Sequence, residues 1–291
     1  MKFTLGTAQF GNTYGISNIT GKTKENQVKK IINYAEREKV KFIELADNYN
    51  NIKKIVKLIK KKEFKIIYKI KITKNFSKKS IHNKLKSFLK LINKKNVYAI
   101  LIHNINNLNK EQIREVFKIF QFMKEKKLVK KFGFSSYSFS AIKKIIMSNQ
   151  INKPNFLQVP LNIFDQSFTD KKKIFFLKKK NNIEIHIRSI FLQGLLLIQQ
   201  NKLKKYFRKW RGLFKKFEKK KDISKLNSKE ICIAFIKQNL KKFDSITLGV
   251  NSYNELKELM ILFKKKNNKK INFKNLNSKD KNIIYPYLWK I

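Results

Sequence analysis

The chain has 291 residues, of which 42% are hydrophobic and 13% aromatic, so it can build a sizeable core and is not a disordered chain. A single cysteine, Cys232, excludes an internal disulfide and is typical of a reducing compartment. The first residues have no apolar secretion-signal segment, and no apolar stretch is long enough to cross a membrane. These features predict a cytoplasmic protein without a transmembrane segment.

The net charge of +50 comes from 69 Lys and Arg residues against 19 Asp and Glu. Such a balance is also typical of nucleic acid binding proteins. However, only five of the basic residues are arginine, the side chain that recognition of bases and phosphates favours. The lysines spread over the whole length with abundant Asn, Ile and Phe, a set that A/T-rich codons favour. The sequence therefore favours a solvated lysine coat over a specific nucleic acid partner, with polyanion binding as the weaker alternative.

Short apolar runs alternate with helical patterns along the whole chain. The runs predict strands, and apolar residues three and four positions apart predict helices between them. The scarcity of glycine predicts that Asn occupies many turns and helix ends. The eight predicted strands are residues 3–7, 41–46, 64–70, 97–103, 132–135, 156–159, 183–188 and 245–248.

Strands that alternate with helices pair in parallel through right-handed crossovers. Eight such units in 291 residues fit a closed barrel better than an open sheet, so we predict an α/β fold with a (β/α)8 TIM barrel. No linker-like stretch divides residues 1–291, which predicts a single domain. The sequence contains neither a Walker A loop nor a Gly-x-Gly-x-x-Gly fingerprint, and one Cys with three scattered His predicts no metal site.

The segment from Leu203 to Phe217 carries an apolar, mostly aromatic stripe flanked by lysines. A basic amphipathic helix can lie on an anionic membrane. A barrel helix with a lysine-rich outer face explains the same pattern and is the favoured interpretation. Because the segment follows the seventh predicted strand, Tyr206 and Trp210 are candidates for lining a substrate pocket.

Polar side chains stand at the ends of three consecutive predicted strands. Glu44 lies at the end of the second, with Tyr49 in the loop beyond it, and Lys69 and His103 end the third and fourth. Since the carboxyl ends of the strands hold the active site of such a barrel, we expect these four side chains to meet there.

With these residues in place, the chain resembles the aldo-keto reductase family from its first strand to about Leu262. The resemblance implies reduction of a small-molecule carbonyl substrate by hydride transfer from a nicotinamide cofactor. The run FLQGLLL at 191–197 is similar to bacterial members encoded among surface-polysaccharide genes, which points to a sugar derivative. The matching motifs are LGTAQFG (5–11), FIELADNY (42–49), IH (102–103), FGFSS (132–136), LQVPLN (157–162), RSIFLQG (188–194) and DSITLGV (244–250).

The resemblance places the catalytic residues at Tyr49, Lys69, His103 and Glu44. Tyr49 would be the general acid, Lys69 would lower its pKa from about 10, and His103 would bind the carbonyl oxygen. Glu44 would hold the lysine, but it stands where the family has aspartate, and residues 50–53 replace the family's Gly-x-Ser-Glu. These departures motivate a second hypothesis, a barrel that binds nucleotide or a partner without turnover.

The resemblance also implies ten cofactor-binding residues. Helix starts favour phosphate, and Ser252 suits such a site, so NADP(H) is favoured over NAD(H), although Asn251 stands where a basic residue is usual. Glu255 and Glu258 either meet the adenosine or face solvent. The sequence makes no prediction of the oligomeric state. The ten residues are Ser135, Ser136 and Gln158 at the carboxamide, Arg188 beside the nicotinamide ring, Ser189, Leu192 and Gly194 at the pyrophosphate, and Gly249, Asn251 and Ser252 at the 2′-phosphate.

Overall fold

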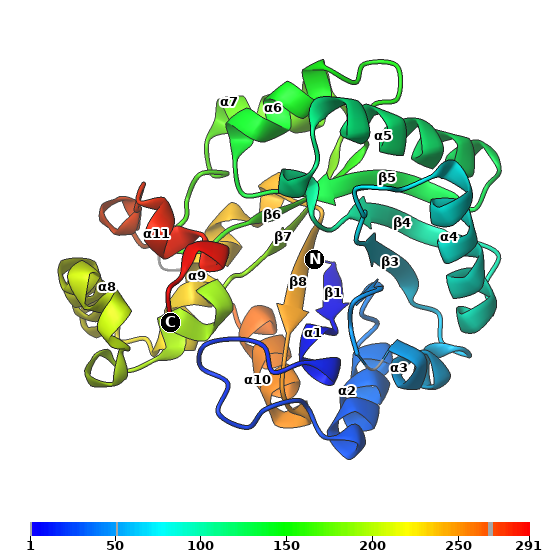
Figure 1. Cartoon of the computed structure of the whole chain (residues 1–291). Helices are drawn as coiled ribbons and strands as arrows, with labels where there is room; N and C mark the ends of the chain where they lie inside the picture. Colours follow the sequence, from blue (N-terminus) through cyan, green and yellow to red (C-terminus); the bar gives the residue numbers. More distant parts are fainter. Residues whose placement is uncertain (1, 51, 267–269) are drawn as a thin grey trace.

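The computed structural model describes residues 2–50, 52–266 and 270–291. Within these residues, eight parallel strands pair in chain order and close into a barrel, with β1 beside β8. Helices surround the strands (Figure 1). The predicted (β/α)8 barrel is confirmed. Position 51, part of the altered loop after Tyr49, lies outside the described residues.

All eight predicted strands are present, and most of their ends differ by no more than one residue from the prediction. The exception is β5, which begins three residues earlier because Lys130 and Lys131 interrupt its apolar run in the sequence. The strands are β1 (Phe3–Gly6), β2 (Phe42–Ala46), β3 (Lys65–Ile70), β4 (Val97–Ile102), β5 (Val129–Ser135), β6 (Phe156–Pro160), β7 (Glu184–Arg188) and β8 (Ser245–Gly249).

Asparagine begins or ends several of the helices, as the low glycine count predicted. Asn109 and Asn227 form capping boxes at helix starts, and Asn93 takes the left-handed conformation, with φ of 53°, after α4. The helices are α1 (Ala8–Gly11), α2 (Glu25–Arg37), α3 (Ile52–Ile59), α4 (Lys78–Ile92), α5 (Lys110–Glu125), α6 (Phe139–Met147), α7 (Lys171–Ile174), α8 (Arg211–Ser224), α9 (Ser228–Asn239), α10 (Tyr253–Lys264) and α11 (Lys281–Ile284), with short 3-10 turns between some of them.

The aromatic segment after β7 packs as a barrel element. Residues 205–210 form a 3-10 helix that leads into α8, and Phe207, Phe214 and Phe217 are buried. The expectation that Tyr206 and Trp210 line the pocket is wrong, because both are bound by the C-terminal segment. Tyr206 donates its hydroxyl hydrogen to the carbonyl oxygen of Asn282 at 3.0 Å, and Trp210 donates Nε1–H to Asp280 at 3.0 Å. Figure 1 shows α8 and α11 on the same side of the barrel. No helix of the described residues is long and apolar enough to span a membrane.

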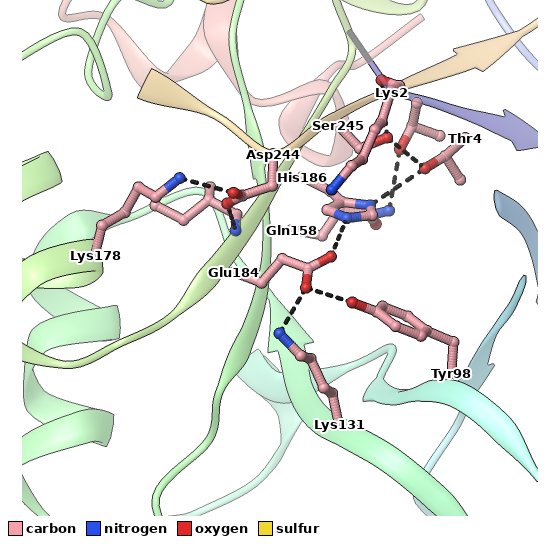
Figure 2. Close-up of polar contacts among 12 residues, drawn as sticks. Lys2, Thr4, Tyr98, Lys131, Gln158, Lys178, Glu184, His186, Asp244 and Ser245 are labelled. Carbon is pink, nitrogen blue, oxygen red and sulfur yellow. Dashed lines mark hydrogen bonds and ion pairs between the residues drawn. The ribbon is translucent and has the colours of Figure 1, made fainter. Parts of the chain in front are cut away.

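A polar network joins the amino-terminal ends of five strands (Figure 2). Tyr49 and His103 follow the opposite, carboxyl-terminal ends of β2 and β4. The Glu184 carboxylate accepts hydrogen bonds from the Tyr98 hydroxyl and the Lys131 ammonium, both at 2.6 Å. Its other oxygen contacts His186 Nε2 at 2.7 Å, and His186 Nδ1 lies 3.2 Å from the Thr4 hydroxyl. Burial alone would raise the pKa of Glu184, but these partners hold that pKa at about 2.

Replacing Glu184 by Ala is expected to lower the free energy of unfolding by about 2–4 kcal/mol, because three polar partners, the buried His186 and the partly buried Tyr98 and Lys131, lose their acceptor. Wild-type stability should also fall as the pH drops from about 5 towards 2, since the unfolded carboxyl binds its proton first. Urea denaturation measures both effects. Glu115→Ala, which breaks an exposed ion pair with Lys118, should change stability by less than about 1 kcal/mol. Equal losses in the two variants would contradict the structural role of Glu184.

Candidate active site

A cavity of about 730 Å³ lies at the carboxyl ends of the strands, and its wall includes all four predicted catalytic residues. Alternate side chains of a strand point to the same face, and this explains why several of these residues lie close together. Along β2, β3 and β6, the apolar residues Phe42, Ile67 and Phe156 point into the barrel and pack in one internal cluster. Two positions further along each of these strands stand Glu44, Lys69 and Gln158. Three polar groups therefore lie above an apolar floor.

Glu44 is the centre of the buried polar contacts at this end of the barrel. Its Oε1 atom lies 3.6 Å from Lys69 Nζ and accepts a hydrogen bond from the Tyr49 hydroxyl at 3.3 Å. Its Oε2 atom accepts from the Gln158 amide, whose own oxygen accepts from Lys69 Nζ at 3.3 Å. Glu44 is 5% exposed and Lys69 is 6% exposed, so water competes little for these contacts.

The expected lowering of the Tyr49 pKa by Lys69 is wrong for this arrangement. Burial and the Glu44 carboxylate raise that pKa well above its usual value of 10.0. The extra methylene of glutamate, compared with aspartate, brings the carboxylate to the tyrosine hydroxyl. Asp47 does not take over the lysine, because it binds the backbone N–H of Lys71 and the ammonium of Lys84. Tyr49 is therefore held as a protonated phenol, the form that can act as an acid.

Shortening the acid by Glu44→Asp is expected to release the Tyr49 hydroxyl while leaving a negative charge beside Lys69. The pKa of Tyr49 should then fall. Because only the protonated phenol is an acid, kcat for reduction should begin to decline at a lower pH in the variant than in the wild type. A pH profile of kcat measures this shift, with Glu115→Asp as the control. Superimposable profiles would show that Glu44 does not set the Tyr49 pKa.

The other two catalytic candidates, Lys69 and His103, differ in charge. Burial lowers the pKa of Lys69, and the Glu44 carboxylate acts in the opposite direction to keep the ammonium charged. Burial and the nearby Lys69 charge lower the pKa of His103 to about 3, so the imidazole is neutral at physiological pH. The rings of His103 and Tyr49 lie edge to face, with centroids 6.4 Å apart. A neutral imidazole and a phenol whose O–H donates to Glu44 thus lie on one side of the cavity.

Six of the ten predicted cofactor residues line the cavity, and the other four do not. Among the four, Ser136 accepts a hydrogen bond from the backbone of Ser138, and Ser252 caps α10. The Gln158 amide is bound by Glu44 and Lys69, and Leu192 belongs to the apolar core. The six cavity residues are Ser135, Arg188, Ser189, Gly194, Gly249 and Asn251. Cofactor contacts by all ten stay a prediction.

The residues at this end of the barrel fit a nicotinamide dinucleotide in charge and in space. Arg188 supplies a cation, and its Nε and Nη1 atoms donate to the hydroxyls of Ser135 at 3.1 Å and Ser189 at 3.2 Å. Gly194 has φ of 91°, and a Cβ there would overlap the Ser17 side chain, so only glycine lets these two loops meet. No group of three or more His, Cys, Asp or Glu among the described residues is placed to hold a metal ion.

Sequence reasoning missed much of the remaining cavity wall. Tyr14 and Tyr137 come from two loops, and Tyr287 comes from the 3-10 helix Pro286–Leu288. The Arg188 guanidinium lies 4.2 Å from the centre of the Tyr137 ring. The Tyr14 hydroxyl accepts a hydrogen bond from Gln193 at 3.2 Å. Several asparagines could have been found from their position directly after predicted strands. The wall includes Asn12, Asn48, Asn104, Asn106 and Asn107.

The fold and the site define a (β/α)8 barrel with a polar cavity at the carboxyl ends of its strands. The chain belongs to the aldo/keto reductase family, whose model matches residues 2–281, and it is an NAD(P)H-dependent oxidoreductase. No curated protein matches its sequence.

Solved structures share the fold at low sequence identity. The holo form of an aldo-keto reductase from Bacillus halodurans is similar with a TM-score of 0.68 and 15% identity, over 91% of this chain and 87% of that one. A glycerol dehydrogenase from Gluconobacter oxydans is similar with a TM-score of 0.62 and 17% identity, over 90% and 86% of the two chains.

Proposed function

We propose that the protein reduces an aldehyde or ketone group of a sugar derivative, with Tyr49 as the general acid. The observation that carries this proposal is the meeting of Tyr49, Lys69, His103 and Glu44 on the wall of one cavity. The sequence favours NADP(H) as the cofactor, with NAD(H) as the alternative, and that choice depends on the adenosine end of the cavity. A cytoplasmic location stays a prediction from the sequence.

The four side chains divide the work of carbonyl reduction. Arg188 and Ser189 would hold a nicotinamide cofactor, which would supply the hydride for the carbonyl carbon. Tyr49 donates its hydroxyl proton to the carbonyl oxygen, so that the alcohol forms as the phenol becomes a phenolate. The neutral His103 imidazole donates a hydrogen bond to the same oxygen and orients the carbonyl group. Lys69 provides positive charge for the phenolate, and Glu44 keeps Tyr49 protonated before each turnover.

The remaining wall supports a polar, hydroxyl-bearing substrate. Asn48, Asn106 and Asn107 offer amide groups, each with two donors and one acceptor oxygen, which suit hydroxyl groups. Tyr14 and Tyr287 add aromatic surface and a hydroxyl each. A wall of amides and tyrosines fits a sugar aldehyde or keto sugar better than a purely aliphatic carbonyl compound.

A second candidate is a barrel that binds nucleotide without turnover. The hydrogen bond from Tyr49 to Glu44, in place of one to Lys69, is the observation that favours it. In that case the acid would be held away from the substrate, and cofactor binding would persist without chemistry.

Cofactor oxidation, measured with a panel of aldoses, keto sugars and aliphatic aldehydes, distinguishes the reductase from the silent barrel. The assay uses moderate salt so that the +50 charge does not bind anions indiscriminately. We expect turnover with NAD(P)H, faster with sugar aldehydes than with aliphatic aldehydes of the same chain length. Saturable cofactor binding without turnover of any carbonyl compound would favour the silent barrel. Absence of cofactor binding would remove both.

A further inference from the structure

One end of the cavity lies where β8 ends and α10 begins. This end carries an acidic side chain, Glu255. Gly249, Asn251 and Glu255 line this part of the wall. The Glu255 carboxylate accepts a hydrogen bond from the backbone N–H of Asn251 at 2.8 Å, while the Ser252 hydroxyl caps the helix by accepting from the Glu255 N–H. A carboxylate of the chain itself is therefore seated where a helix start would otherwise attract a phosphate.

Among the residues that the structure describes, no cation on the cavity wall is paired with this carboxylate. Of the basic side chains among the described residues, Lys69 and Arg188 line the cavity. Lys69 contacts Glu44, and Arg188 donates to the hydroxyls of Ser135 and Ser189. In the described part of the chain, no lysine or arginine forms an ion pair with Glu255. Lys229 is paired with Glu258 at 2.5 Å instead. In a chain with 69 basic residues, this end of the cavity lacks the positive charge that a phosphate dianion requires.

We propose that Glu255 makes the cavity selective for NAD(H) over NADP(H). This inference rests on the proposed function, because it takes the α10 end as the adenosine end. A carboxylate can accept a hydrogen bond from a free ribose 2′-hydroxyl, as acidic residues do in other dinucleotide-binding folds, whereas a 2′-phosphate there meets like charge. The predicted preference for NADP(H) depended on Ser252 and the start of the helix. The structure shows that the Glu255 carboxylate binds the backbone N–H of Asn251 at this helix start.

The hydrogen bonds of Asn251 support the same preference for NAD(H). Its backbone N–H is taken by Glu255, and its side-chain oxygen accepts a hydrogen bond from Asn18 at 3.2 Å. Asn251 stands where the family usually has a basic residue, and its side chain is bound to the loop after β1. Its backbone N–H and its side-chain oxygen are both bound, and its neutral amide carries no charge that could replace a cation.

Calorimetric titration of the purified wild type with NADH and NADPH, at matched ionic strength, tests the proposal through binding rather than activity. We expect NADH to bind at least about tenfold more tightly than NADPH, because like charges placed together are costly. In Glu255→Gln, NADPH affinity should rise about tenfold, and NADH affinity should fall a few-fold as the hydrogen-bond acceptor weakens. Thermal melting checks that the variant is folded.

Glu258→Gln is the matched control, because it removes the same charge one turn further along α10, where the carboxylate pairs with Lys229. It should change neither affinity by more than about twofold. Equal or tighter binding of NADPH by the wild type would overturn the selectivity and leave the reductase proposal standing. The same shift in both variants would show a long-range charge effect and overturn the role of Glu255. Absence of binding by either cofactor would overturn both proposals.

Discussion

Replacing Tyr49 by Phe is expected to lower kcat for carbonyl reduction by about 10²–10⁴-fold, the usual contribution of a positioned general acid. The substitution removes one hydroxyl, which donates to Glu44 at 3.3 Å, and leaves the ring beside His103 in place. The cofactor dissociation constant should therefore stay within about threefold of the wild type. Steady-state kinetics and calorimetric titration give the two quantities.

Tyr206→Phe provides the matched control, because this tyrosine contacts Asn282 and lies outside the cavity wall. It should leave kcat and cofactor affinity unchanged. If Tyr49→Phe keeps most of the turnover, another group protonates the alkoxide and the assignment of Tyr49 as the acid fails. If cofactor binding is lost together with turnover, the hydroxyl has a role in binding that the structure does not show.

Replacing Glu44 by Gln is expected to reduce the free energy of unfolding by about 3–5 kcal/mol, since it leaves the buried Lys69 ammonium without its carboxylate. The Glu44 side chain is 7% exposed, as is that of Lys69, so water cannot take over the lost pairing. Turnover should also fall by about 10²-fold, because the position of Lys69 relative to Tyr49 is no longer fixed. Urea denaturation and kinetics measure the two losses.

The double variant Glu44→Gln with Lys69→Met measures how much stability depends on the interaction between the two charges. Removing both charges should cost less stability than the sum of the two single losses, because no unpaired charge remains buried. Additive losses would contradict a direct coupling between Glu44 and Lys69. Glu115→Gln, whose partner Lys118 is 54% exposed, should change stability by less than about 1 kcal/mol.

The barrel could be predicted because its signal is periodic and local. Every strand appears in the sequence as a short apolar run. Eight strands that alternate with helices are typical of a sheet that closes into a barrel. The start of β5 could not, since Lys130 and Lys131 interrupt the run. Lys131 is tolerated there because Glu184, 53 residues later, binds its ammonium at the end of the barrel. A contact across such a distance leaves no local pattern.

The place of the four proposed catalytic residues on one cavity wall could be predicted from the sequence, but their hydrogen bonds could not. Glu44, Lys69 and His103 follow from their places at strand ends, whereas the partner of the Tyr49 hydroxyl depends on the reach of one methylene, about 1.5 Å. The cavity wall shows a related limit of local patterns. Tyr206 lies in the loop region that borders such pockets, yet the C-terminal segment binds it elsewhere. The sequence identifies Glu255 as an acidic residue near a helix start. Only the structure shows that its carboxylate accepts a hydrogen bond from the backbone N–H of Asn251.

Transfer of deuterium tests the central claim most directly. The protein is incubated with a reduced cofactor in which both hydrogens on the reactive carbon of the nicotinamide ring are deuterium, together with a sugar aldehyde. The alcohol product is analysed by mass spectrometry. We predict one carbon-bound deuterium in the product of the wild type, and almost no product with Tyr49→Phe. Alcohol formed without deuterium, or labelled equally by both proteins, would contradict hydride transfer in this cavity with Tyr49 as its acid.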